Sequence, residues 1–215
     1  MVKQVDFKAE LEIEPEKLRA FVQALFEGAG TKAPQAALVA GLLVDNDLHG
    51  ASSHGTNLPT GWGYLKQMRQ GGINPNPVPK IISDEGSCRV YDGDGGIGHP
   101  VCYEAMTWCI QKAKEVRAPH FPLSHSCLHT KVIRSRGEQV GVAVATTRNH
   151  HHFGAAVQWG RMALEADCIG IAVSSHRYEL NPNSSVSGVN GTSPISIVRN
   201  HTTHDLRHFF SDSRS

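Results

Sequence analysis

A chain of 215 residues, 40% of them hydrophobic, is long enough to bury a core as one large domain or as a domain with a smaller lobe. Its 21 basic and 20 acidic residues leave a formal charge of +1, so we expect no overall field that would recruit nucleic acid or an anionic membrane. No apolar run approaches the roughly 20 residues that span a bilayer, and the N-terminus lacks the apolar segment of a signal peptide, so we expect a cytoplasmic protein.

The first 72 residues predict a helical lobe. Residues 14–27 repeat apolar side chains with the period of a helix, with Pro15 in the first turn and Gly28 at the end. A second, more apolar helix follows Thr31 and ends in the segment DNDLHGASSHG, where aspartates and histidines gather around a turn. A third, weaker helix is expected around WGYLKQMRQ. The turn after the second helix is a candidate site.

The next part of the chain predicts a hairpin, a glycine-rich turn and a helix. The prolines of INPNPVPK require extended chain, and the segments KIIS and CRVYD on either side of DEGS predict a β-hairpin. The segment DGDGGIGH lacks the lysine of a P-loop and the terminal glutamate of an EF-hand, so a tight turn is the favoured interpretation. A helix begins near Pro100 and closes at KAKE, and residues 117–139, which show no period, are expected to be a loop or an insertion.

A strand, a polar loop, a helix and a second strand follow between residues 140 and 175. The two strand segments, VGVAVATT and DCIGIAVSS, are apolar on both faces, which predicts a βαβ unit whose parallel strands are covered on both sides. The loop RNHHHFG then leaves the carboxyl end of a strand, where open α/β sheets bind ligands. After Ser175 we expect a polar loop, a short strand and, over residues 199–215, a poorly structured tail.

Seven segments of the chain, in this order, resemble one family: the malate/L-lactate dehydrogenase-like NAD(P)-dependent oxidoreductases, which also include ureidoglycolate dehydrogenase and diketogulonate reductase. The resemblance implies an α/β fold that is not a Rossmann fold, with an N-terminal helical lobe (1–72), a mixed or parallel sheet with helices (73–198), and a homodimeric assembly. The matching segments are Asp47–Gly50, Ser53–Gly55, GGINPNP, DGDGGIGH, RNHHHFGAA, CIGIAVSS and Gly191–Ile195.

The chain departs from the family pattern at three places. Residues 117–139 have no recognisable counterpart, and after Ile197 the family continues for a long stretch that residues 199–215 do not match. Many members carry an arginine where this chain has Leu58, so the usual clamp for a substrate carboxylate is missing. We therefore expect a truncated relative whose fold is incomplete at the C-terminus.

The resemblance implies hydride transfer between NAD or NADP and a small 2-hydroxy or 2-oxo acid of the malate or lactate type. His54 matches a histidine used in acid–base work and substrate binding, with Ser53 as its hydrogen-bonding neighbour. His152 matches a histidine with a catalytic role, and its place after a strand favours it as the group that moves the proton. The predicted cofactor contacts are Asn149, Gly154 and Ala156, and no metal site is expected.

Each of these residues also has a purely structural interpretation. His54 could cap a helix end, Ser53 could form a turn, and Gly154 could simply begin a helix. At most two of His150, His151 and His152 are expected to be functional. Further histidines are expected at the surface or as caps: His49, His99 and His176.

Two other functions remain open from the sequence. A truncated relative could be an inactive fragment that keeps only a dimerising surface. A histidine-rich metal-binding module could use the HHH run together with a second group of ligands, although their spacing fits no closed zinc pattern. That second group is His120, His125, Cys127 and His129.

Overall fold

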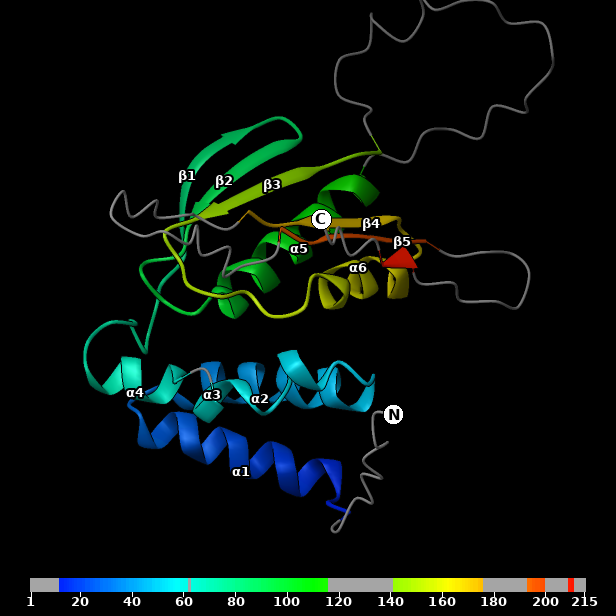
Figure 1. The fold of residues 1–215 in the computed structure, drawn as a ribbon. Helices are drawn as coiled ribbons and strands as arrows, with labels where there is room; N and C mark the ends of the chain where they lie inside the picture. Colours follow the sequence, from blue (N-terminus) through cyan, green and yellow to red (C-terminus); the bar gives the residue numbers. More distant parts are fainter. Residues whose placement is uncertain (1–11, 62, 116–140, 176–192, 200–208, 211–215) are drawn as a thin grey trace, which may run out of the picture. The chain divides into compact units, whose positions relative to one another are not determined.

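The computed structural model describes residues 12–61, 63–115, 141–175, 193–199 and 209–210 (Figure 1). The chain divides into two compact units, Met1–Asn76 and Pro77–Ser215. The boundary expected from the sequence, 72/73, falls within the GGINPNP segment just before this division. Within the described ranges, no helix has the length and apolar content needed to cross a membrane.

The first unit is helical, as predicted. Its main helices are α1 (Pro15–Gly28) and α2 (Ala33–Leu48), which pack on each other; Pro15 and Pro34 occupy their first turns, where a missing amide hydrogen costs nothing. A short 3₁₀ turn (Ser52–His54), α3 (Leu58–Gly61) and α4 (Tyr64–Arg69) follow. The predicted helices at 14–27, after Thr31 and around WGYLKQMRQ are thus confirmed.

Asn76 ties the end of the first unit to the turn between α1 and α2. Its Oδ1 accepts a hydrogen bond from the Lys32 amide at 2.8 Å, and its Nδ2 donates to the Gly30 carbonyl at 2.7 Å. The amide of Asn76 in turn donates to Asn74 Oδ1 at 3.0 Å, which closes a local turn. The GGINPNP segment therefore folds back onto the helical pair rather than serving as a loose linker.

The second unit begins with a mixed three-stranded sheet. Strands β1 (Lys80–Glu85) and β2 (Cys88–Asp92) form the predicted hairpin, and β3 (Val144–Arg148) pairs with β2 in parallel. Helix α5 (Gly98–Glu115) lies between β2 and β3 in the sequence and packs on both. The parallel βαβ unit of this protein is therefore β2–α5–β3.

A second three-stranded sheet is antiparallel. It consists of β4 (Gly170–Val173), β5 (Ile195–Val198) and β6 (Phe209–Phe210), in that order. The prediction that the strands flanking RNHHHFG pair in parallel is wrong, because β3 pairs with β2 and β4 pairs with β5. Within residues 199–215, which were expected to form a poorly structured tail, the structure describes only Arg199 and strand β6.

Helix α6 (Ala156–Glu165) covers one face of the β4–β5 pair (Figure 1). The contact is close because glycines meet: a Cβ placed on Gly170 would lie 2.6 Å from the Gly160 carbonyl oxygen. The helix also buries Trp159, which is 2% exposed. Its ring lies edge-on to the ring of His99, with 6.3 Å between the two ring centroids. His99 is fully buried, so the prediction that it is a surface or capping histidine is wrong as to its exposure.

Candidate active site

The segment after α2 is held by two side chains from the end of that helix. Asn46, which is fully buried, donates from Nδ2 to the His54 carbonyl at 3.0 Å. Asp47 Oδ2 accepts two hydrogen bonds from Thr56, at 3.0 Å from its amide and at 2.6 Å from its hydroxyl. Asp47 also fills the space beside Gly55, where a Cβ would lie 1.8 Å from Asp47 Oδ1. Asn46 and Asp47 therefore hold the backbone at His54 and at Thr56, two residues after it.

The His54 ring has a hydroxyl neighbour and is half-buried. Ser53 Oγ lies 2.9 Å from His54 Nδ1. Because a hydroxyl can donate or accept, this contact suits both neutral tautomers and the protonated ring. Burial lowers the pKa of His54 below its ordinary value. At neutral pH the ring is therefore uncharged and able to take up a proton.

Two other positions near His54 serve the structure of the first unit. His49 is exposed, and its Nδ1–H donates to the Asp45 carbonyl at 2.6 Å, which confirms the prediction of a surface or capping residue. Leu58, at the position where many family members carry arginine, is fully buried at the start of α3. This side chain belongs to the core, so it offers no substrate contact.

The loop between β3 and α6 is joined to the glycine-rich turn that follows β2. This arrangement confirms the prediction that RNHHHFG leaves the end of a strand and enters a helix. The turn itself is tight, as predicted, with Asp94 and Gly95 in succession at positive φ. The two segments share four backbone hydrogen bonds of 2.8–2.9 Å: Gly93 N to Arg148 O, Gly95 N to Asn149 O, His151 N to Gly96 O and Gly98 N to His152 O.

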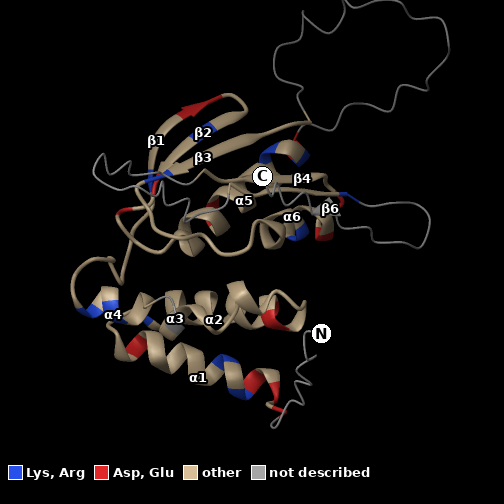
Figure 2. Ribbon diagram, viewed as in Figure 1, with Lys and Arg blue, Asp and Glu red and all other residues tan. Residues whose placement is uncertain are grey.

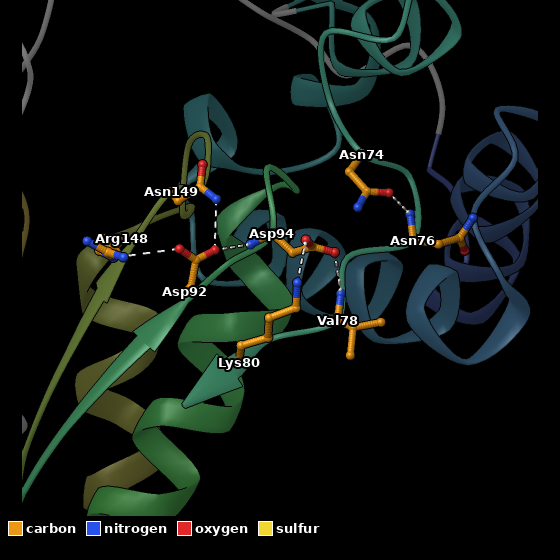
Figure 3. A network of polar contacts seen from close by, with 8 residues as sticks. All are labelled: Asn74, Asn76, Val78, Lys80, Asp92, Asp94, Arg148 and Asn149. Atoms are coloured by element: carbon orange, nitrogen blue, oxygen red, sulfur yellow. Dashed lines mark hydrogen bonds and ion pairs between the residues drawn. The ribbon is translucent and has the colours of Figure 1, made fainter. Parts of the chain in front are cut away.

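Asp92 is the side-chain centre of this junction (Figure 3). Its Oδ1 accepts hydrogen bonds from Asn149 Nδ2 at 2.7 Å and from the Asp94 amide at 2.9 Å, and its Oδ2 lies 3.6 Å from Arg148 Nε. The hydrogen bond from Asn149, followed by that from Asp94, lowers the pKa of the Asp92 carboxyl. Asn149 has a φ of +52°, so its backbone needs this support.

Asp92 and Asn46 were not among the predicted site residues. Each had a weak signal in the sequence: Asp92 ends a strand directly before the glycine-rich turn, and Asn46 lies in the DND segment that ends the second helix.

The three consecutive histidines have different surroundings. His150 Nε2 lies 2.8 Å from Thr147 Oγ1 and its Nδ1 lies 2.7 Å from the His151 carbonyl, so this ring is tied to its own loop. The His151 side chain is exposed. His152 is half-buried, and its Nδ1 accepts a long hydrogen bond of 3.3 Å from the Gly154 amide.

The residues predicted to contact NAD(P) have different surroundings, and their role toward the cofactor remains a prediction. The Asn149 side chain is exposed and could reach a ligand, although its Nδ2 already donates to Asp92. Gly154 is buried at a φ of +84°, and a Cβ there would lie 2.7 Å from His99 Nε2. Ala156 is 8% exposed. Internal packing therefore accounts for the glycine at position 154.

His54 and His152, the two predicted catalytic residues, lie in different units. Their meeting in one site remains a prediction.

No group of three or more His, Cys, Asp or Glu side chains with metal-binding geometry occurs among the residues that the structure covers. The other candidate ligands, His120, His125, Cys127 and His129, lie outside that coverage, as does His176.

A family model described as malate/L-lactate dehydrogenase matches residues 13–127 and 121–212. The two matches together include residues 117–139 and 199–212, so the expectation that these residues have no counterpart in the family is wrong. Among curated relatives, the L-sulfolactate dehydrogenase of Methanocaldococcus jannaschii is 31% identical over 86% of this chain and 46% of its own length. The malate dehydrogenase of Pyrococcus abyssi is also 31% identical, over 86% of this chain and 44% of its own length.

Solved structures show the same likeness. The malate dehydrogenase of Pyrococcus horikoshii OT3 superposes with a TM-score of 0.70 at 26% identity, covering 89% of this chain and 48% of that chain. The chain therefore spans about half the length of the relatives it matches. Because the family model matches most of the sequence and includes segments of both units, this chain belongs to the malate/L-lactate dehydrogenase family.

Proposed function

We propose that this chain carries part of an oxidoreductase that transfers a hydride between NAD or NADP and a small 2-hydroxy or 2-oxo acid. The observation that carries the proposal is the family match, which includes both histidine-bearing segments, 53–55 and 149–154. Relatives named as malate and L-sulfolactate dehydrogenases support the substrate class. When bound, the nicotinamide would supply or accept the hydride. The resemblance further favours a cytoplasmic homodimer.

In this proposal His54 moves the proton. A group that both gives and takes a proton needs a neighbour that tolerates either state, and Ser53 Oγ at 2.9 Å from Nδ1 provides one. The lowered pKa keeps the ring neutral near pH 7, which suits removal of the hydroxyl proton in the oxidation direction. Partial burial also limits competition from water at this ring.

His152 has a different role, as a neutral hydrogen-bond donor to a substrate oxygen. The Gly154 amide can only donate, so Nδ1 of His152 accepts and Nε2 carries the hydrogen in the neutral ring. His54 has a hydroxyl beside Nδ1, which can donate or accept, whereas His152 has a backbone amide, which only donates. His54 is therefore the better candidate for proton transfer.

The substrate carboxylate is held without an arginine at position 58, since Leu58 lies in the core of the first unit. Members that carry arginine there have a bidentate clamp that this chain lacks. The acid substrate is therefore best identified by assay across malate, lactate and sulfolactate and their oxo acids.

The test is cofactor binding followed by turnover. Titration of the purified chain with NADH or NADPH should quench tryptophan fluorescence, and a matching 2-oxo acid should oxidise the bound cofactor. His54→Ala should lower kcat/KM by about 100-fold or more, and His152→Ala by about 100-fold. The matched controls are His49→Ala, a helix-end histidine, and His151→Ala, an exposed neighbour in the same loop; both should keep near-normal rates.

Two possible results distinguish a failure of the proposed dehydrogenase function from a failure of the roles assigned to His54 and His152. If neither cofactor binds to the folded chain, the proposed function fails for this polypeptide. If cofactor is oxidised but the two control variants lose as much activity as His54→Ala and His152→Ala, the function stands and the residue roles fail.

A further inference from the structure

One carboxylate oxygen holds two strained backbone positions in the candidate site. Within the described ranges, three residues other than glycine have a positive φ, and two of them are Asp94 at +54° and Asn149 at +52°. Asp92 Oδ1 accepts a hydrogen bond from each, from the Asp94 amide at 2.9 Å and from Asn149 Nδ2 at 2.7 Å. Left-handed backbone at such residues costs free energy, and positions of this kind gather at functional sites.

The two strained residues belong to the two segments that meet at this end of the sheet. Asp94 lies in the glycine-rich turn after β2, and Asn149 begins the loop between β3 and α6. Asp92 and Arg148, the last residues of β2 and β3, are register partners. The Asp92 side chain is only 17% exposed, so water competes little for its oxygens. Asp92 therefore connects the start of the turn to the start of the loop.

The neighbouring charges favour the ionised form of Asp92. Blue and red segments meet at this end of the β1–β2–β3 sheet in Figure 2. Arg148 Nε lies 3.6 Å from Asp92 Oδ2, and Lys80, the register partner of Asp92 on β1, lies 3.5 Å from Asp94 Oδ1. A hydrogen bond to an ionised carboxylate is about twice as strong as one between neutral groups. The hydrogen bond from Asn149 to Asp92 is therefore of the stronger kind.

The loop has little room to shift against the turn. A Cβ placed on Gly93 would lie 2.7 Å from His150 Cβ, and one placed on Gly98 would lie 2.8 Å from Phe153 Cα. The Gly98 amide also donates to the His152 carbonyl at 2.9 Å. A change in the backbone of Asn149 would therefore either strain these contacts or displace His152, which lies three residues further along the loop.

We propose that Asp92 is a positioning residue for His152, because its hydrogen bonds to Asn149 and Asp94 fix the loop that carries this histidine. The inference rests on the proposed dehydrogenase function, in which His152 donates a hydrogen bond to a substrate oxygen. It also gives the Asn149 side chain a role other than cofactor contact, since its Nδ2 donates to Asp92. A misplacement of about 1 Å in such a donor can cost about 100-fold in rate.

The first experiment compares kcat with cofactor affinity. Asp92→Leu keeps the shape of the side chain but removes the acceptor, so it should lower kcat at least about tenfold, while the dissociation constant of NADH or NADPH changes less than about twofold. Asp92→Asn keeps Oδ1 as the acceptor of both hydrogen bonds and should restore most of the lost kcat. Asp84→Leu is the matched control, because Asp84 is a carboxylate on β1 of the same sheet that accepts a hydrogen bond from Arg89; it should keep kcat near the wild-type value.

The second experiment measures the loop without substrate, by amide hydrogen exchange followed with NMR. The Gly95 amide, which donates to the Asn149 carbonyl, should exchange at least about tenfold faster in Asp92→Leu and near the wild-type rate in Asp92→Asn. The Val144 amide, which donates to the Ser87 carbonyl at the other end of the β2–β3 pair, should stay protected in all variants. Its protection shows that each variant is folded.

Asn149→Gly is a second variant for the case in which Asp92→Leu fails to fold. Glycine adopts a positive φ without strain, but it lacks the amide group that Asp92 holds. This variant should also lower kcat with little change in cofactor affinity. A loss confined to cofactor affinity would overturn the inference, because it would mean that the Asn149 side chain contacts the cofactor.

Unchanged exchange of the Gly95 amide in a folded Asp92→Leu variant overturns the inference whatever the turnover. A loss of kcat that is equally large in Asp84→Leu, or that Asp92→Asn does not restore, also overturns it. A wild-type chain that oxidises no cofactor with any of the 2-oxo acids would instead contradict the proposed function, and the exchange rates would still decide whether Asp92 holds the loop.

Discussion

The charge state of His54 follows from its partial burial. Desolvation penalises the protonated ring, so its pKa lies below the ordinary 6.5. An NMR titration of the His54 ring proton should therefore give a midpoint below 6.5, with the resonance assigned by its absence in His54→Gln. A midpoint at or above 6.5 would mean that burial does not control this ring.

The burial of His54 also makes the free energy of unfolding depend on pH, and the direction of this dependence can be predicted. Between the folded-state pKa and 6.5, the unfolded chain binds more protons at this site, so the free energy of unfolding falls as pH falls through that window. Above 6.5 both states are neutral here, and the contribution is fully retained. His54→Gln should remove this part of the pH dependence.

Replacing Gly154 with alanine tests whether the folded structure itself requires a glycine at this position of the candidate site. It lies at a φ of +84°, and a Cβ would meet His99 Nε2 at 2.7 Å, whereas Gly95 lies at +67° with open space around it. Gly95→Ala should cost about 1 kcal/mol for the left-handed backbone alone. Gly154→Ala should cost more, about 2–3 kcal/mol, because the clash adds to it. Denaturant unfolding of both variants measures the difference, and equal costs would contradict the packing argument.

Histidines show how far a residue's environment could be inferred. The capping role of His49 was predictable, because a histidine at a helix end has carbonyls within reach of its own ring. The burial of His99 was not, because it depends on Trp159, which lies far along the chain. The local sequence identifies the residues adjacent to a histidine in the chain, but not the distant residues that contact it in the folded structure.

Among the helices that the structure describes, α2 and α6 each contain an interior glycine, and replacing the two glycines with alanine should have opposite effects. In α2, a Cβ on Gly41 would meet nothing within 4 Å, so Gly41→Ala should stabilise the fold by up to about 1 kcal/mol through helix propensity. In α6, a Cβ on Gly160 would lie 2.5 Å from Val198 Cγ2, so Gly160→Ala should destabilise by about 1–3 kcal/mol through overpacking.

Thermal or denaturant unfolding of the two alanine variants gives the signs directly. Stabilisation by Gly160→Ala would show that α6 can move away from the β4–β5 pair without cost, and would contradict the close helix–sheet contact.

Strand position was more predictable than strand partnership. The apolar segments at β3 and β4 lie where the sequence places strands, and the hairpin of β1 and β2 follows from its turn. The pairing of β3 with β2, and of β4 with β5, was missed. An apolar period marks a segment that will be buried, but it carries no information about which other strand supplies the hydrogen bonds.

The first unit has an apolar core of its own, which predicts independent folding. Its core residues are each at most 7% exposed: Val22, Phe26, Val39, Leu43, Val44, Leu58, Tyr64, Leu65, Met68 and Ile73. A fragment of residues 1–76 should therefore show helical circular dichroism and a cooperative thermal transition. A fragment of residues 1–61 is the control: it lacks α4, Ile73 and the Asn76 clamp, and should lose cooperativity. A non-cooperative 1–76 fragment would show that this unit depends on the rest of the chain.

The whole chain spans about half the length of its relatives. Its family is therefore established, whereas its activity remains a proposal. Ordered family motifs were enough to predict the family, because each short motif survives within its own segment. The joint site that those motifs serve depends on how the units meet, and it remains a prediction that the activity assay and the His54 and His152 variants address.

The sequence by itself determined the helical first unit, the hairpin, the strand-to-helix loop that carries three histidines, and membership of a dehydrogenase family, because each depends on local period, turn chemistry or short motifs. Only the tertiary structure decided the strand partners, the burial of His99 and Leu58, the Asp92–Asn149 contact and the exposure of apolar side chains on β4 and β5. These arise from contacts between residues distant in the chain, and no local pattern encodes which distant surface will cover a given side chain.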